Sequence, residues 1–493
     1  MRAAAELELR RRGLRSGPAR TNITLTQFKQ QLWRDYEHAR HQEAIDALLG
    51  QVGDYVLTGG ARGVKRAMIF LPPRHGKCLV GGTLGTLANG ERKPIEQVCH
   101  SDMVISLGVR YNTERAKVIG THVNGVRPVL KVTLVSGRSI TCTENHPLLT
   151  VNGWVDAESL KPEDAIAVHR RIATDEGKAL PEGVAALLGY IVGDGTYAPS
   201  GKGLAFTTND TDTLEHIKAI LSPRGWSIRR VKGDPYTVLL VNPAKFGRIP
   251  GDNPTGLIRR YMKRALAKDK VVPERIFTAA HDDIRQFLAA YFNCDGTVTT
   301  FREGVAEYYS VSERLLSDVQ HLLARFGIYS SLRIKIGRYA DKPHKSWRLS
   351  ISGGDLVRFA DEIPVIGSKG IKLRAAAESI RNRPHYPEYD AIPNGWQQYL
   401  KIGKGVLRTR YGVRIDKKYK RGTARHLVEQ VAEIDDNDEL RKLCNPDIIW
   451  ERVKSIEKVG EQPTFDIEVA DTHNYCVDGI VSHNTMSVSR YFP

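Results

Sequence analysis

The two halves of a phosphate-binding motif stand about 400 residues apart in this sequence. The apolar residues 68–71 predict a short buried strand, and the sequence Pro-Pro-Arg-His-Gly-Lys follows directly and ends at Lys77. A phosphate-binding loop needs a Ser or Thr next, because its amides surround the phosphates, its lysine reaches the β and γ oxygens, and the hydroxyl ligates Mg²⁺. The next residue is Cys78, a poor ligand for a cation that prefers oxygen. The missing hydroxyl stands at Thr485, so the 407 residues from 78 to 484 are interpreted as an insertion in a shorter host chain.

Joining Lys77 to Thr485 gives Pro-Pro-Arg-His-Gly-Lys-Thr. This string resembles the Walker A segment of phage terminase large subunits, the ATPases that package DNA. Leu71 is a departure, because the general pattern has its first glycine there. The resemblance implies that Gly76, Lys77 and Thr485 bind ATP and Mg²⁺ once they are joined. Residues 1–77 and 485–493 would then be fragments of a P-loop ATPase, too short to show a Walker B strand or a packaging nuclease.

The charge balance favours a polyanionic partner. Lys and Arg number 73 against 56 acidic residues, a formal net charge of +17, which fits nucleic acid but also a merely soluble basic protein. No run of about 18 apolar residues is present, and the first fifteen residues lack the apolar core of a signal peptide. The six cysteines form neither a C-x-x-C pair nor a zinc-like spacing. We therefore expect no membrane partner and a cytoplasmic location, in a bacterial or phage-infected cell.

The ends of the insertion carry residues that suit self-excision. Cys78 can move the Lys77 acyl group from nitrogen to sulfur, and the resulting thioester is attacked more easily than an amide. The Thr485 hydroxyl can receive that acyl group, and the Asn484 side chain can attack its own carbonyl to form a succinimide and cut the chain. A last shift from oxygen to nitrogen leaves an ordinary Lys77–Thr485 peptide bond. Every step is intramolecular, so no cofactor is expected for splicing.

These ends resemble those of an intein, and internal motifs extend the resemblance. The segment Thr-Cys-Thr-Glu-Asn-His-Pro contains the T-x-x-H spacing of Thr143 and His146. The resemblance implies that His146 protonates the departing amide nitrogen and that Thr143 gives a supporting hydrogen bond. Taken without the boundary residues, a Thr and a His three positions apart are usually an ordinary loop pair.

The terminal intein motif is similar to residues 464–475, which alternate like two strands meeting at a turn. The resemblance assigns Asp466 to coordinating the two acyl transfers, and His473 and His483 to assisting the cyclisation of Asn484. The alternatives are an exposed strand acid for Asp466 and a hydrogen-bonded turn histidine for His473.

Two related segments lie within the insertion. Residues 187–195 and 288–296 align at their Tyr, Asp and Gly positions, and place Asp194 and Asp295 101 residues apart. The pair resembles the two motifs of a single-chain LAGLIDADG homing endonuclease, in which two helices pack about a pseudo-twofold axis and each delivers an acid to a metal site. Small residues would permit close packing, and the two carboxylates would hold Mg²⁺ between phosphate and water. A single motif would more often be a buried helix that ends in an Asp-Gly turn.

Basic residues follow each motif. Glycines 225 and 327 precede strand-like basic segments that could face double-stranded DNA, and Lys232 and Lys335 are candidates for the charge-stabilising lysines of the family, although solvated lysines are the simpler interpretation. Residues 404–425 form a denser basic stretch with two tyrosines, either an additional DNA contact or a solvated, flexible connection.

The sequence thus predicts a multidomain protein. Its parts are a mainly β Hint-type splicing domain, an α+β endonuclease with pseudo-twofold halves, and short P-loop fragments at both ends. We expect a host segment (1–77), an N-terminal splicing part (78–172), the endonuclease (173–373), a basic connector (374–444), a C-terminal splicing part (445–484) and a second host segment (485–493). The excised insert is expected to be a monomer that uses Mg²⁺ at Asp194 and Asp295. Two rivals are an insert that only binds DNA and a host ATPase that works unspliced.

Overall fold

The computed structural model describes residues 77–197, 203–243, 253–300, 304–339, 342–382, 390–400, 410–412 and 422–484. The strand expected at residues 68–71 lies outside the described residues, as do Gly76 and Thr485. Within the described ranges, no helix is both long and apolar enough to span a bilayer.

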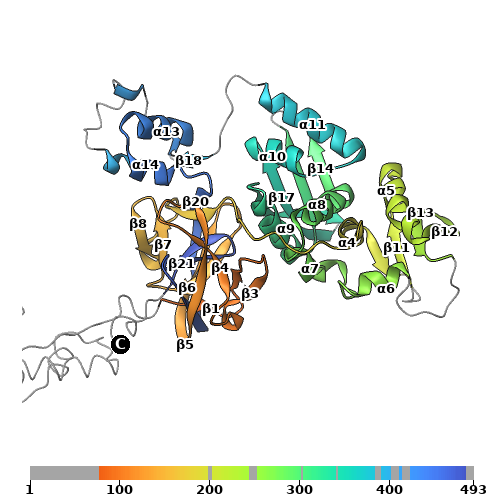
Figure 1. The fold of residues 1–493 in the computed structure, drawn as a ribbon, viewed down its shortest axis with the longest axis horizontal. Coiled ribbons are helices and arrows are strands. Elements are labelled where there is room, and N and C mark those ends of the chain that lie inside the picture. Colours follow the sequence, from red (N-terminus) through yellow and green to blue (C-terminus); the bar gives the residue numbers. More distant parts are fainter. Residues whose placement is uncertain are drawn as a thin grey trace, which may run out of the picture. The chain divides into compact units, whose positions relative to one another are not determined.

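The two ends of the insertion fold into one β domain, formed by residues 77–172 and 445–484. Its strands, orange to yellow and blue in Figure 1, form a twelve-stranded sheet. The strand order is β3-β2-β21-β22-β7-β9-β20-β1-β6-β5-β4, with β8 beside β7. The strands are β1 (Leu79–Val80), β2 (Leu84–Thr86), β3 (Arg92–Pro94), β4 (Met103–Leu107), β5 (Thr113–Leu134), β6 (Ser139–Thr143), β7 (Pro147–Thr150), β8 (Gly153–Asp156), β9 (Ala165–His169), β20 (Ile448–Val469), β21 (Asn474–Val477) and β22 (Ile480–His483). Strands from the two ends alternate across the sheet, so neither end could complete it alone.

Strands β5 and β20 hold this sheet together. Each has 22 residues, and they pair antiparallel from Val453 opposite Leu134 to Val469 opposite Val118. Apolar side chains from both ends of the insertion, including Leu79, Val132, Ile467 and Tyr475, share one core and are fully buried. Burying this apolar surface is the main favourable contribution to the fold. Leu79 of β1 and Ile480 of β22 are therefore both held in this core.

Residues 173–382 form an inserted domain with two similar halves. The first half contains α4 (Val184–Gly193), β10 (Gly195–Tyr197), β11 (Leu204–Thr207), α5 (Thr211–Leu221), β12 (Ser227–Val231) and β13 (Asp234–Val241). The second contains α8 (His281–Asp295), β14 (Gly296–Thr299), β15 (Val305–Ser310), α9 (Glu313–Arg325), β16 (Ser331–Tyr339) and β17 (Lys342–Ser352). Their sheets have the equivalent orders β10-β11-β13-β12 and β14-β15-β17-β16. The remaining helices are α6 (Pro254–Arg259), α7 (Glu274–Phe277), α10 (Gly354–Glu362) and α11 (Gly367–Arg381).

Helices α4 and α8 pack directly against each other (Figure 1). A Cβ added at Gly189 would lie 2.4 Å from the Phe287 carbonyl oxygen, and one added at Gly193 would lie 2.3 Å from the Cys294 Cβ. Such distances exclude any larger side chain without a shift of the backbone. The expected close approach through small residues is present, and Cys294 fits because Gly193 leaves room for it.

The segment expected to be a connector is partly folded. Its described elements are β18 (Ala391–Ile392), β19 (Thr423–Ala424), α13 (Arg425–Ile434) and α14 (Asp438–Leu443). Val428 and Leu440 of these helices share a core with Leu149 and Val481 of the β domain. The boundary expected at residue 373 falls inside α11. Short 3₁₀ turns occur at η1 (Ile95–Gln97), η2 (Ala157–Ser159), η3 (Ser222–Arg224), η4 (Ala267–Asp269) and η5 (Trp396–Tyr399).

Helix α9 joins the inserted domain to the β domain through polar contacts. The Arg92 guanidinium donates to Asp318 at 2.5 Å and also pairs with Asp478. The Arg325 guanidinium donates to the Gly90 carbonyl at 2.5 Å, and the Gln320 amide donates to the Ser136 carbonyl at 3.3 Å. Buried charges are costly unless they are paired, so these contacts explain why α9 carries charged residues on buried positions.

Candidate splicing site and paired-acid site

The first and last residues of the insertion lie on neighbouring parts of the β domain. Cys78 comes directly before β1, which runs between β20 and β6 with Leu79 opposite Phe465 and Cys142. Asn484 comes directly after β22 and is fully buried. Because the central strands hold both ends, residues separated by about 400 positions in the sequence share one buried site.

Thr143 holds the backbone at Cys78 from both sides. The Cys78 amide donates to the Thr143 hydroxyl at 3.0 Å, and the Thr143 amide donates to the Cys78 carbonyl at 3.0 Å. The Cys78 amide nitrogen is the atom that leaves in the expected first acyl shift. Burial, and then the nearby Asp466 carboxylate, raise the pKa of the Cys78 thiol to about 11. The thiol is therefore protonated at neutral pH and must lose its proton before it attacks.

His146 is completely buried close to the same residues. Its amide donates to the Thr143 carbonyl at 3.0 Å, and its Nε2 lies 2.9 Å from the Ser482 hydroxyl. Its Nδ1 has no hydrogen-bond partner in the described part of the chain. Burial, and then the charges of His483 and Lys77, lower the pKa of His146 to about 3. The imidazole is thus neutral, and its Nδ1 is available to a reacting group. A buried histidine with a purely structural role would normally have both ring nitrogens hydrogen-bonded.

Asp466 is buried, so the alternative of an exposed strand acid is excluded. Its side chain is 1% exposed, and its carboxylate accepts from the Tyr475 hydroxyl at 3.3 Å and from the Ile467 amide at 2.9 Å. Its charge acts on the Cys78 thiol through space. Asp466 and Cys78 therefore belong to one electrostatic environment.

His473 forms the turn between β20 and β21. It adopts a left-handed backbone with φ of 54°, and its carbonyl accepts from the Asn484 amide at 3.1 Å. The imidazole Nδ1 is buried without a hydrogen-bond partner among the described residues. His473 therefore fixes the position of Asn484 through its backbone, and its side chain is not the hydrogen-bonded turn histidine of the alternative.

The carbonyl of Asn484 is surrounded by cationic or titratable side chains. The His483 Nδ1 lies 2.6 Å from the Asn484 carbonyl oxygen, and the Lys77 Nζ donates to the same oxygen at 3.3 Å. Trp154 packs edge-on against the His483 ring at 4.7 Å. The Asn484 side-chain amide donates weakly to the Val469 carbonyl at 3.4 Å. The structure therefore brings together Cys78, Thr143, His146, Asp466, His473, His483 and Asn484, whereas Thr485 lies outside the described residues.

Asp194 and Asp295 form a second site at the ends of α4 and α8. Burial, and then the Asp194 charge, raise the pKa of Asp295 to about 6, which shows that the two carboxylates share one environment. Burial also raises the pKa of Asp194. No cluster of three or more His, Cys, Asp or Glu side chains suited to a metal occurs among the described residues. Two carboxylates nonetheless suit Mg²⁺, which commonly binds one or two carboxylates and takes its other ligands from water and phosphate.

Two lysines that the sequence analysis missed cap these helices. The Lys270 Nζ donates to the Gly193 carbonyl at 2.7 Å, and the Lys369 Nζ donates to the Cys294 carbonyl at 2.9 Å. Burial lowers the pKa of both lysines, and the two acids oppose that shift. A signal was present in the sequence, because Lys270 follows Asp194 by 76 residues and Lys369 follows Asp295 by 74.

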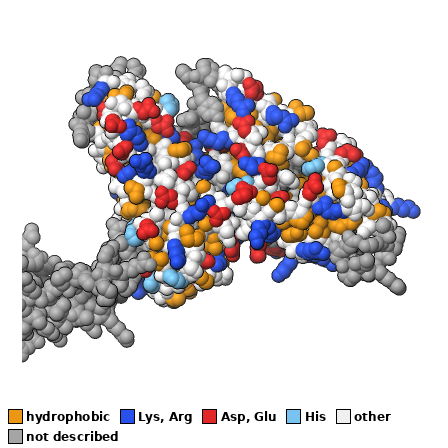
Figure 2. Space-filling model, viewed as in Figure 1, with side chains coloured by type: hydrophobic (Ala, Val, Ile, Leu, Met, Phe, Trp, Pro, Cys, Tyr) orange, Lys and Arg blue, Asp and Glu red, His pale blue; other side chains and the backbone are white. Residues whose placement is uncertain are grey.

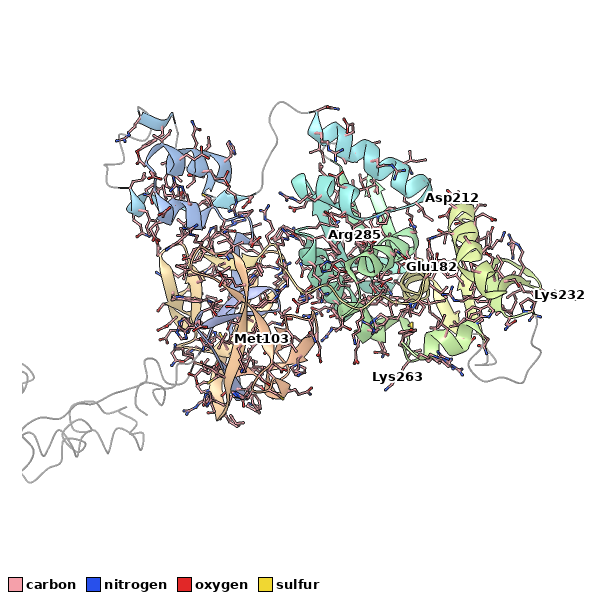
Figure 3. The ribbon with its side chains drawn as sticks, in the orientation of Figure 1. Met103, Glu182, Asp212, Lys232, Lys263 and Arg285 are labelled. Atoms are coloured by element: carbon pink, nitrogen blue, oxygen red, sulfur yellow. The ribbon has the colours of Figure 1, made fainter. Side chains whose placement is uncertain are left out.

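Lys232 and Lys335, the lysines expected near the two acids, do not make the helix-end contacts of Lys270 and Lys369. Lys232 is exposed at the turn between β12 and β13, at the outer tip of that hairpin (Figure 3). Lys335 is exposed on β16, with its Nζ 4.3 Å from the centre of the Tyr309 ring. The expected basic strands do occur at β12 and β16, with Arg229 and Arg333 also exposed.

Most of the basic stretch 404–425 lies outside the described residues. Its two described arginines make internal ion pairs: Arg410 lies 3.0 Å from Asp435, and the buried Arg425 lies 2.6 Å from Asp390. Arg425 is therefore part of the folded structure and does not belong to a solvated basic face. Figure 2 shows Lys and Arg interspersed with Asp and Glu on the visible face, without a single basic block.

Comparisons with known proteins agree on the β domain. The family model for the intein splicing domain matches residues 86–484. The chain is 30% identical over 448 residues to the replicative DNA helicase DnaB of Rhodothermus marinus, covering 84% of this chain and 46% of that protein. It is 27% identical over 459 residues to the DnaB of a Nostoc species, covering 86% and 51%. A third match, 25% identical over 448 residues, is the RecA protein of Mycobacterium tuberculosis, covering 83% and 56%.

The chain spans about half the length of the two DnaB relatives. Among solved structures, a DnaB intein from Synechocystis matches with 28% identity and a TM-score of 0.19, covering 19% of this chain and 70% of that chain. A DnaX mini intein from Spirulina platensis matches with 26% identity and a TM-score of 0.17, covering 19% and 67%. The fold assignment rests on the strand pairing and on the family model, which covers most of the chain. The chain belongs to the intein splicing domain family and contains a self-splicing, mainly β intein domain.

Proposed function

We propose that residues 78–484 excise themselves and that Lys77 becomes joined to Thr485. The observation that supports these junctions most strongly is the contact of the Lys77 Nζ with the Asn484 carbonyl oxygen at 3.3 Å. Lys77 carries the carbonyl that is cut first and Asn484 the carbonyl that is cut last. Their meeting in one buried site is what an intramolecular transfer between the two ends requires.

The geometry suggests a role for each side chain in the first step. The Cys78 sulfur attacks the Lys77 carbonyl, the Cys78 amide nitrogen leaves, and a thioester forms. Thr143 hydrogen-bonds that nitrogen. The neutral His146 would take the proton that the Cys78 thiol loses and pass it to the leaving nitrogen. The buried Asp466 acts on the thiol, whose pKa of about 11 makes the removal of its proton part of the step.

The later steps use the other end of the site. The Thr485 hydroxyl attacks the thioester and takes the acyl group, which returns a free thiol to Cys78. Asn484 Nδ2 then attacks its own carbonyl, loses a proton, and releases the Thr485 amine, which gains one. His473 and His483 support this cyclisation by holding the Asn484 amide and carbonyl oxygen.

Splicing is tested by placing different affinity tags before residue 1 and after residue 493. The proposal expects both tags to appear in one short product, because ligation joins the host segments. Tags that stay on separate fragments would contradict ligation at these junctions.

We further propose that the inserted domain is a LAGLIDADG-type endonuclease that cuts double-stranded DNA. The equivalent strand orders of its halves and the paired Asp194 and Asp295 support this proposal. Asp194 and Asp295 would hold Mg²⁺, which would supply positive charge to the phosphate and activate water. Lys270 and Lys369 would stabilise the charge that develops on the phosphate. A domain that only binds DNA remains the rival, and a cleavage assay separates the two.

The host is proposed to be an ATPase whose phosphate-binding loop is restored by splicing. The sequence Pro-Pro-Arg-His-Gly-Lys-Thr supports a terminase large subunit, with Gly76, Lys77 and Thr485 binding ATP and Mg²⁺. The relatives named first are DnaB helicases, which makes a helicase host the alternative. The insertion alone has 407 of the 493 residues, close to the 84% covered by the first match, so that match depends mostly on the insert.

The insertion point predicts where the nuclease cuts. An element that spreads by cutting uninterrupted genes should recognise DNA that encodes Gly76, Lys77 and Thr485 as one run. A host cannot easily escape by mutating this site, because Lys77 and Thr485 would contact phosphate and Mg²⁺ in the restored loop. Purified insert and Mg²⁺ should cut a plasmid that carries the continuous junction and spare one that carries the interrupted gene. Equal cutting of both plasmids, or cutting of an unrelated sequence alone, would contradict this assignment.

A further inference from the structure

The side chain of Lys77 is buried in the splicing site although the residue belongs to the host. It is 1% exposed, and its Nζ lies 3.3 Å from the Asn484 carbonyl oxygen and 3.3 Å from the His483 Nδ1. Burying an ammonium group away from water is costly, so we expect this position of the lysine to serve a function. In a restored phosphate loop this lysine would reach toward phosphate, which gives no reason for it to point at Asn484.

The hydrogen positions around the Asn484 carbonyl follow from the distances. The His483 Nδ1 is 2.6 Å from the carbonyl oxygen, and two lone pairs at that distance would repel. The Nδ1 therefore carries the hydrogen and donates it to the carbonyl. It then has no lone pair to accept from Lys77, so of these two contacts the Lys77 ammonium makes its hydrogen bond to the same carbonyl oxygen. Two donors, one of them charged, converge on one oxygen.

We propose that Lys77 is a catalytic residue of the C-terminal cleavage, acting with His483 as an oxyanion hole at the Asn484 carbonyl. When Asn484 Nδ2 attacks this carbonyl, negative charge develops on the oxygen before the bond to Thr485 breaks. A donor placed where that charge develops lowers the barrier, and a buried site strengthens the effect. The inference rests on the proposed splice junctions.

The order of the steps keeps Lys77 at this position. The transfer from Cys78 to Thr485 moves the Lys77 carbonyl onto the residue next to Asn484, so the lysine stays tethered beside the carbonyl when Asn484 cyclises. The host residue thereby contributes to its own release. The proposed host ATPase needs this lysine to bind phosphate and cannot replace it. An insert at this point can therefore rely on the lysine, and its splicing should be less efficient at a site that lacks one.

The proposal is tested with Lys77→Met, which keeps an unbranched side chain one atom shorter and removes its charge. In a Cys78→Ala background, only cleavage after Asn484 remains, and its rate is followed by release of a C-terminal tag. Lys77→Met should slow this release about 100-fold, as expected for the loss of one oxyanion donor. Lys77→Arg, which keeps charged donors, should retain most of the rate. Lys131→Met removes an exposed lysine of β5 and should leave the rate unchanged.

A second measurement separates this role from a structural one. In an Asn484→Ala background, hydroxylamine should release residues 1–77 from the thioester at a similar rate with Lys or Met at position 77. Unchanged C-terminal cleavage in Lys77→Met, equal losses in the Met and Arg variants, or equal losses at both junctions would overturn the proposal. If the chain with Lys77 intact is not cleaved after Asn484, the proposed junctions fail instead.

Discussion

Replacing Cys78 with Ala should abolish ligation of the host segments while the bond after Asn484 still breaks. Alanine has no sulfur to accept the Lys77 acyl group, so no thioester forms. The Asn484 carbonyl keeps its contacts with His483 and Lys77, and cyclisation can proceed. The expected products are residues 1–484 and residues 485–493, and they are resolved by intact-mass measurement.

The complementary variant, Asn484→Ala, should give the opposite fragment pattern. It has no side-chain amide to form a succinimide, so the bond after position 484 stays intact. The thioester at Cys78 still forms, and hydroxylamine releases residues 1–77. Ligated product in either variant would show that the reaction does not need the residue replaced in that variant.

Asp194→Asn or Asp295→Asn should abolish Mg²⁺-dependent DNA cutting. The cleavage rate should fall so far that a longer incubation does not restore the product. Each change removes one of the two carboxylates proposed to hold the metal, and removal of a direct metal ligand disables the activation of water. Both variants should splice normally, because the splicing residues belong to the β domain. Asp282→Asn is the matched control, since Asp282 lies on the same helix α8 with a side chain 85% exposed.

The measurement for this second prediction is linearisation of a plasmid that carries the continuous junction. Full cutting of the plasmid by both variants would show that neither Asp194 nor Asp295 is needed for DNA cleavage. Loss of splicing in both variants would instead show that the domains are coupled, and α9 offers a route through its contacts with Arg92 and Gly90.

The residues that the sequence singled out for splicing lie together in the structure, and they could be found because the patterns that mark them are local. Cys78 and Asn484 stand at the boundaries proposed from the interrupted motif, and the turn before β21 is visible as alternation around His473. The duplicated motif likewise placed two acids at the ends of two helices, α4 and α8. In each case the residue type and its neighbours carry the chemical meaning.

Contacts between distant segments could not be predicted in the same way. Ser482 beside His146, and Lys270 and Lys369 over the helix ends, depend on how strands and helices pack. An isolated lysine in a basic chain looks solvated, which is why Lys232 and Lys335 were equally suitable candidates. The packing of α13 and α14 against the β domain was also missed. The basic residues that precede these helices in the sequence are typical of a connector.

Liquid chromatography with mass spectrometry of the expressed, unaltered chain tests the central claim most directly. The account predicts a free insert of 407 residues that begins at Cys78 and ends at Asn484 as a succinimide or its hydrolysis product. It also predicts a host product whose proteolytic fragments include a peptide that spans Lys77 joined directly to Thr485. A full-length chain that persists after prolonged incubation, with no peptide spanning that junction, would contradict the account.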